Sequence, residues 1–149
     1  MSAIRLQQAW MPFLDRWDWA LFSTNTFRAQ VHPERADRVW RVWISMMNRA
    51  LYGHRWWKRG KGLYWCRACE LQQRGAPHFH GLLGGEGAED LDCGRWQEEW
   101  WRLAGLARME PPRSKQGVQH YLTKHIARGA EIDFGGPLPD VLCSEASFR

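Results

Sequence analysis

The sequence predicts an α+β fold: a single domain in which a central antiparallel sheet of four to five strands is flanked by helices. The chain has 149 residues and 44% of them are apolar, which fits one globular domain with a sizeable core and leaves no room for two ordinary ones. Segments with alternating apolar residues and segments with a helical period follow one another in the order β-α-β-β-α-β-α. Only five residues join two of the strand-like segments, which predicts that these two are antiparallel neighbours.

The first half of the chain is predicted to contribute two helices and one strand. Residues 6–17 favour a short helix broken by Pro12, and residues 18–27 alternate as a strand does. Residues 32–53 predict a longer helix, because proline is common in the first turn of a helix and glycine just past its end. On a helical wheel its arginines lie opposite an apolar arc. We expect that arc to be buried, and it contains Val39, Val42, Trp43, Met46, Met47, Ala50 and Leu51.

The second half begins with a predicted hairpin. Residues 63–71 and 77–84 are strand-like, and the short loop between them places Glu70 near or directly across from His78. Residues 93–105 then predict a helix, and the strand-like segment that follows is interrupted by prolines.

A last helix and a tail complete the chain. Residues 114–129 predict a helix with Ser114 as its cap and Gly129 as its stop. We place the functional domain at residues 1–129. Residues 130–149 contain glycines and prolines without a clear period, and we interpret them as a loop or an extended cover rather than a separate domain. A fifth strand would come from this tail or from the residues before Trp17.

The composition favours a soluble, cytoplasmic protein. The first ten residues contain no apolar core of a signal peptide, and no apolar run approaches the length that spans a bilayer. Without an export signal we expect reduced thiols rather than disulfides. A Cys-x-x-Cys pair in a strand faces opposite sides, which argues against a zinc site here. The four cysteines are Cys66, Cys69, Cys93 and Cys143.

The positive charge is concentrated in one part of the chain. From Arg35 to Arg67 there are nine basic residues and one acidic residue, a local excess of +8 within a total of +5, so the rest of the chain carries −3. Tryptophans interleave this stretch, including Trp40, Trp43 and Trp65, and the combination suits nucleic acid. A solvated helix face followed by a basic loop explains the charge alone equally well. The candidate DNA-binding residues are Arg38, Arg41, Arg49, Arg55, Trp56, Trp57, Lys58, Arg59, Lys61 and Arg128.

Two histidines, His78 and His80, stand on either side of one apolar residue in the second hairpin strand. Residues i and i+2 of a strand point to the same face, so the two imidazoles would project together toward a metal ion. Glu70 is the favoured third ligand because an anionic oxygen suits a hard dication, and Gln72, on the same strand face, is the alternative. Without an acid or a downstream tyrosine, exposed strand histidines would explain the pattern better.

The last predicted helix carries a second group of chemically active side chains. On a helical wheel Tyr121, Lys124 and Arg128 fall within one sixth of a turn beside an apolar row, with His125 between the two sets. Taken alone, a tyrosine at the edge of an apolar stripe is more often packing than chemistry.

Together these motifs resemble those of the HUH endonucleases, specifically the rolling-circle replication initiators with a single catalytic tyrosine. The resemblance runs from about Trp17 to Gly129 and uses three ordered stretches, of which "PHFHGLL" and "YLTKHI" are the most specific and "FSTNTF" the least. It implies a five-stranded antiparallel sheet, a divalent metal and a tyrosine that cleaves one DNA strand. The spacing of Lys124 after Tyr121 looks like that of the initiators.

The chemistry that the resemblance implies agrees with the residue types. A phenol has a pKa of about 10 and is a poor nucleophile at neutral pH unless its target is polarised. A divalent cation held by His78, His80 and Glu70 would orient the scissile phosphate, and Tyr121 would attack it to leave a 5′-phosphotyrosine and a free 3′-hydroxyl. Lys124 would orient the phosphate or metal. Either Mn²⁺ or Mg²⁺ is compatible with such ligands, and Mn²⁺ tolerates imidazole better.

The sequence therefore predicts a nickase that cuts and rejoins single-stranded DNA at a plasmid or viral origin, with an origin hairpin and a host helicase as further candidate partners. A single-tyrosine HUH transposase is the enzymatic alternative. A non-catalytic module that binds single-stranded nucleic acid through the basic helix and the tryptophan-rich loop is the alternative of another class.

Overall fold

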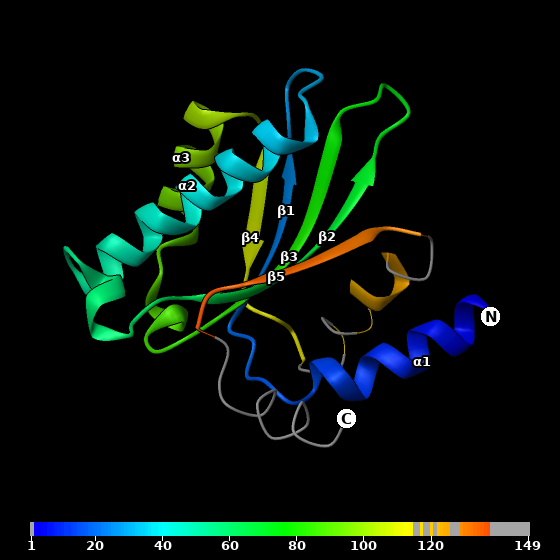
Figure 1. Ribbon diagram of the computed structural model, residues 1–149, viewed down its shortest axis with the longest axis horizontal. Helices are drawn as coiled ribbons and strands as arrows, with labels where there is room; N and C mark the ends of the chain where they lie inside the picture. The colour runs from blue at the N-terminus through cyan, green and yellow to red at the C-terminus, as the bar shows by residue number, and fades with distance from the viewer. Residues whose placement is uncertain (1, 115–116, 118–119, 121, 126–128, 138–149) are drawn as a thin grey trace.

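The computed structural model describes residues 2–114, 117, 120, 122–125 and 129–137. It confirms the predicted α+β class: five antiparallel strands form one sheet in the order β4-β1-β3-β2-β5, flanked by helices (Figure 1). The strands are β1 (Leu21–Thr26), β2 (Tyr64–Leu71), β3 (Pro77–Gly84), β4 (Ala107–Glu110) and β5 (Glu131–Gly135). The helices are α1 (Ala3–Leu14), α2 (Pro33–Tyr52) and α3 (Cys93–Leu103), with short 3₁₀ helices η1 (Trp56–Arg59) and η2 (Ala88–Asp90). No helix in the described part of the chain is both long and apolar enough to cross a membrane.

The fifth strand comes from the tail, so the interpretation of residues 130–149 as a loop or cover is wrong for Glu131–Gly135. These residues form β5, which pairs with the outer edge of β2. Residues before Trp17 instead form α1, and Pro12 lies inside that helix without breaking it. Pro12 has no backbone N–H to bond to the carbonyl of Gln8, and α1 continues for only two residues beyond it.

The face of the sheet covered by α2 and α3 holds the larger core, which is rich in tryptophan. Trp40, Trp43 and Trp100 are fully buried there, and the Trp40 ring packs edge-on against Phe79 of β3, with centroids 5.7 Å apart. Aromatic rings bury large apolar areas and favour such edge-to-face contacts. Three of the tryptophans that interleave the basic stretch, Trp40, Trp43 and Trp65, therefore belong to the core, and the candidates for base stacking, Trp56 and Trp57, do not.

The buried face of α2 differs from the predicted arc. Val42 is 49% exposed and Ala50 is also exposed, whereas Trp40 and Ile44, which were outside the arc, are buried. A helical wheel weights all apolar residues alike, but the large indoles of Trp40 and Trp43 dominate the packing and turn the helix toward their side. The predicted helix bounds, with Pro33 in the first turn and Gly53 at the end, are confirmed.

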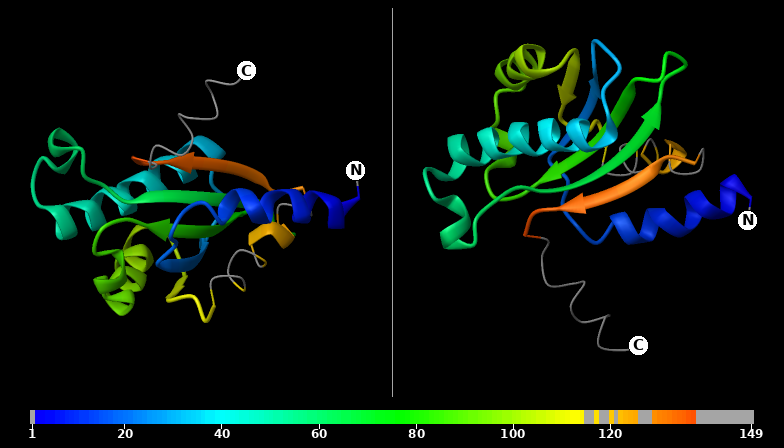
Figure 2. Two further views of the ribbon diagram at one scale, coloured as in Figure 1. Left: turned by 90° about the horizontal axis from the view of Figure 1, so that it is seen from below. Right: turned by 45° about the horizontal axis from the view of Figure 1, so that its top comes forward.

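The opposite face of the sheet is covered by α1 and by the last helical segment. Leu14, Trp17, Leu82 and Leu122 are buried together on this side, and α1 also stacks its Trp10 on Phe134 of β5. In Figures 1 and 2, α2 and α3 lie toward one end of the molecule and α1 toward the other.

The last predicted helix is described only in part. Residues 117, 120 and 122–125 are helical. The Ser114 hydroxyl accepts a hydrogen bond from the backbone N–H of Gly117 at 3.0 Å, as expected of a cap, and Gly129 has a φ of +92°, as expected of a stop.

Gly81 of β3 provides a test of the core. A methyl group on its Cα would lie 2.6 Å from the Trp40 ring, so the helix–sheet contact depends on the missing side chain. We expect Gly81→Ala to lower the free energy of unfolding by about 1–3 kcal/mol, the usual cost of overpacking, in urea denaturation followed by circular dichroism. Gly94→Ala, on the exposed start of α3, is the control and should leave stability unchanged or slightly higher. Equal stability of both variants would contradict this close contact.

Candidate metal centre

The β2–β3 hairpin brings a carboxylate and imidazoles together. Glu70 of β2 is the direct cross-strand partner of His78, as the loop length predicted. The turn is closed by hydrogen bonds from the backbone N–H of Gln72 to the carbonyl of Ala76 (2.9 Å) and from that of Gly75 to the carbonyl of Gln72 (2.7 Å). Gly75 has a φ of +78°, a backbone conformation that glycine adopts without strain.

Strand alternation places His78 and His80 on one face of β3, with their ring centroids 4.5 Å apart. Phe79 points to the other face, into the α2 core. His80 is buried and His78 is half-buried. The prediction that both imidazoles project together is therefore confirmed, and they do so on the side of the sheet away from α2.

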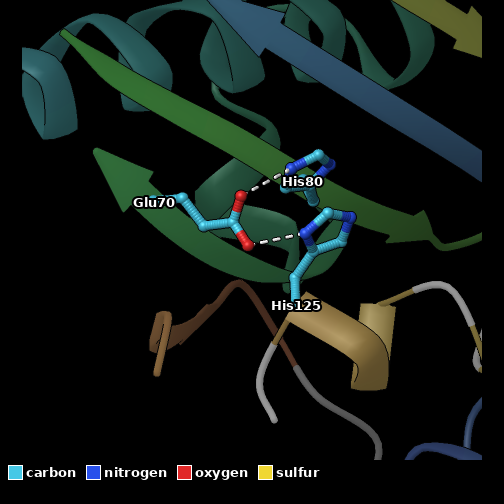
Figure 3. Close-up of side chains that lie close together, drawn as sticks. All are labelled: Glu70, His80 and His125. Atoms are coloured by element: carbon cyan, nitrogen blue, oxygen red, sulfur yellow. Dashed lines mark hydrogen bonds and ion pairs between the residues drawn. The ribbon is translucent and has the colours of Figure 1, made fainter. Parts of the chain in front are cut away.

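The third imidazole comes from the last helix (Figure 3). His125 Nδ1 lies 2.6 Å from Glu70 Oε1, while His80 Nε2 lies 3.5 Å from Glu70 Oε2. The rings of His80 and His125 are stacked, 3.5 Å apart with planes inclined by 10°. One carboxylate thus reaches two imidazoles from different elements, and the ligand atoms of the three residues lie within 4.8 Å of one another.

Burial sets the charge of these histidines. Desolvation, followed by the neighbouring His125 and His78, lowers the pKa of His80 to about 3. Desolvation also lowers the pKa of His78, against the opposing effect of Glu70. Both rings are therefore neutral at pH 7, and a neutral imidazole has a lone pair with which to bind a metal.

The donor set fits a divalent transition metal. Two imidazole nitrogens and one carboxylate oxygen suit Mn²⁺ or Zn²⁺ better than Mg²⁺, which prefers oxygen ligands and water. Glu70 is half-buried, with 27% of its side chain exposed, whereas His80 and His125 are buried. Glu70, His80 and His125 are the residues that would hold the ion.

His78 lies beside this group. Its Nδ1 is 3.3 Å from the Gln72 side-chain amide, and Gln72 in turn accepts a hydrogen bond from Arg74 at 3.0 Å. Gln72, the alternative third ligand, thus contacts an imidazole rather than joining the group of three. His78 in turn packs its ring against that of His80, with centroids 4.5 Å apart, and so supports one of the three ligands from outside the group.

The catalytic candidates of the last helix are described unevenly. Lys124 is exposed, and its ammonium makes no ion pair with any described residue. Tyr121 and Arg128 lie outside the described residues.

Sequence reasoning missed His125 as a ligand. It noted the residue only as lying between an apolar row and a cationic row of a helix. The available signal was its position three residues after Leu122: residues i and i+3 share a helix face, and Leu122 belongs to the apolar row that must meet the sheet.

The described DNA-binding candidates lie on α2, on η1 and in the loop residues that flank η1. Trp57 is 56% exposed and Trp56 is half-buried. Three of the cations have partners within the described part of the chain: Arg41 and Lys61 form ion pairs with acidic side chains, and Arg59 donates to a backbone carbonyl.

Comparisons of this chain with protein-family models, with curated proteins and with solved structures found no match.

Metal binding can be measured directly by isothermal titration with Mn²⁺ and Zn²⁺. We expect His80→Ala and His125→Ala to weaken binding by well over tenfold, because each removes a ligand, and His78→Ala to weaken it by about 10–100-fold, as loss of a supporting side chain does. His54→Ala, an exposed histidine at the end of α2, is the control and should bind normally. Circular dichroism would confirm that each variant is folded. Normal binding by a folded His125→Ala variant would exclude this centre.

Proposed function

We propose that this protein is a metal-dependent endonuclease that nicks and rejoins single-stranded DNA through a covalent 5′-phosphotyrosine, as a rolling-circle replication initiator does. One observation carries the proposal: His125 of the last helical segment lies 2.6 Å from Glu70 of the hairpin. In the sequence, Tyr121 precedes His125 by four residues and is bonded to Leu122, which is buried against the sheet. The contact at His125 supports the proposal because Tyr121 is its near neighbour in the sequence.

A bound divalent ion would supply Lewis-acid polarisation of the phosphate and neutralise the charge that develops in the reaction. The chain's own contribution is positioning. Glu70, His80 and His125 come from a hairpin and a helix that pack together, so their donor atoms are held before substrate arrives. Tyr121 attacks phosphorus and displaces the 3′-oxygen, and the phosphodiester energy is kept in the phosphotyrosine for rejoining. Lys124, on the same helix, supplies a positive charge that orients the phosphate.

The other two tyrosines are poorly suited to this role. The Tyr52 hydroxyl donates to the Glu86 carbonyl at 2.7 Å and the Tyr64 hydroxyl to the Asp18 carbonyl at 2.6 Å. Burial raises the pKa of both phenols. Tyr64 also lies at the other end of β2 from Glu70, about 20 Å away at the usual rise per residue.

The Tyr-x-x-Lys spacing favours nicking at a plasmid or viral origin. Mn²⁺ or Mg²⁺ would be the metal, and a host helicase would separate the strands. The same chemistry in a single-tyrosine transposase is the alternative, and the two differ in the DNA ends that they recognise.

The tyrosine provides the decisive test. Incubation with a pool of random single-stranded oligonucleotides and Mn²⁺ should give a protein–DNA adduct that survives a denaturing gel. Tyr121→Phe removes one hydroxyl, so adduct, nicking and rejoining should all vanish while DNA binding stays similar. Tyr52→Phe and Tyr64→Phe are matched controls and should retain the adduct. Adduct formation by Tyr121→Phe would assign the nucleophile elsewhere, and absence of any adduct from the wild type would favour a binding module.

The metal and the lysine are tested in the same assay. EDTA should stop nicking and Mn²⁺ should restore it. His80→Ala should abolish nicking because a metal ligand is lost, whereas His78→Ala should reduce nicking in line with its weaker metal binding. Lys124→Ala should only slow the reaction, since the nucleophile remains. Cleavage at an undiminished rate in EDTA would rule out the metal mechanism.

A further inference from the structure

An open groove runs along the outer face of α2 and ends at η1. Its volume is about 750 Å³. Its described lining residues are Arg38, Arg41, Val42, Ser45, Met46, Arg49, His54, Arg55, Trp56 and Trp57. We propose that this groove is a second site for a single nucleic-acid strand, separate from the metal centre.

The groove and the metal centre belong to opposite sides of the sheet. α2 packs on the face to which Phe79 points, through its contact with Trp40, whereas His80 points to the other face and stacks on His125. The groove lies on the surface of α2 that faces away from the sheet, because its lining residues alternate with the buried ones along the helix. A strand in this groove therefore makes contacts that the metal centre does not supply.

The charge of the groove selects an anion. Its described lining contains four arginines and no acidic residue. Arg38, Arg49 and Arg55 form no ion pair within the described part of the chain, and only Arg41 is neutralised, by Asp37 at 2.8 Å and Asp133 at 3.6 Å. Unpaired guanidinium groups spaced along a helix match the repeated charges of a phosphate backbone.

Two exposed apolar side chains between the arginines, Val42 and Trp57, suit contact with bases. Val42 and Trp57 are 49% and 56% exposed, although a valine and a tryptophan are more often covered. Trp57 packs edge-on against Trp56, with centroids 5.5 Å apart, and against His54 at 6.4 Å, and more than half of it remains open to solvent. A fixed aromatic ring between cations is the arrangement on which unpaired bases stack.

The backbone at the end of the groove supports a built site. Arg55 has a φ of +61°, and it is the only described non-glycine residue with a positive φ. This left-handed conformation is unfavourable for an arginine and persists where the surroundings impose it. It begins η1 and so fixes how the two tryptophans are presented.

These features favour a single strand over a duplex or an acidic protein. The bases of a duplex are paired and stacked on one another, so they would not cover Val42 and Trp57. An acidic protein would pair with the arginines but has no bases to stack on the Trp57 ring. The inference does not depend on nicking, because binding at this groove requires neither Tyr121 nor a metal.

The test is fluorescence anisotropy of labelled (dT)₂₀ with the full chain in EDTA, which separates binding from cleavage. Trp57→Ala should weaken binding about 5- to 150-fold, the loss expected for one stacked base. Trp101→Ala is the matched control, since Trp101 is 52% exposed on α3, and it should bind normally. Arg38→Gln and Arg49→Gln should each reduce the slope of log affinity against log salt by about 0.7, whereas Arg102→Gln, also on α3, should not.

Position is checked by photocrosslinking. An oligonucleotide containing 5-iodouracil should crosslink to the tryptic peptide that holds Trp56 and Trp57. Unchanged affinity of Trp57→Ala with unchanged salt slopes, or crosslinks only outside this peptide, would overturn the proposal. Binding of a 20-base-pair duplex more tightly than (dT)₂₀, with the same sensitivity to these variants, would overturn the choice of a single strand.

Discussion

The candidate centre depends on the pairing register of β2 and β3. Side chains alternate between the faces of a strand. If β2 shifted by one residue against β3, Glu70 would point into the tryptophan-rich core and His80 would lose its carboxylate neighbour. The five-residue turn fixes that register at the start of β3, and the close packing of Gly81 under Trp40 fixes it in the middle of the strand. The larger core on one face and the polar group on the other are therefore consequences of the same pairing.

Burying a carboxylate among imidazoles is costly unless the groups satisfy one another. Glu70 is bonded to His125 at 2.6 Å and approaches His80 at 3.5 Å, and burial keeps His80 neutral. His80, being neutral, does not offset the charge of the Glu70 carboxylate that it approaches. A bound cation would offset that charge, which is a physical reason for expecting an ion where the donor atoms converge.

The sequence was informative where a local pattern decides the structure and uninformative where a distant contact does. Strand alternation and loop length placed Glu70 opposite His78 correctly, because both are local properties. The role of His125 depends on how a helix packs on a sheet, which no period reveals. The tilt of α2 toward Trp40 depends on a glycine forty-one residues away. β5 is short, half-buried and without alternation, so it is defined only by its pairing with β2.

The basic excess of the sequence is divided in the structure between folding and surface. Arg67 is buried, lies 4.3 Å from the Phe79 ring centroid and pairs with Asp37 at 2.9 Å, so it links β2 to α2 rather than meeting solvent. Arg59 and Lys61 are held by neighbouring groups as well. Several of the cations that are exposed and form no ion pair among the described residues, including Arg38, Arg49 and Lys58, lie on α2 and η1. The net charge counted along the chain therefore overstates the charge at the surface. Most tryptophans are buried, but Trp57 is exposed in the groove that the arginines line.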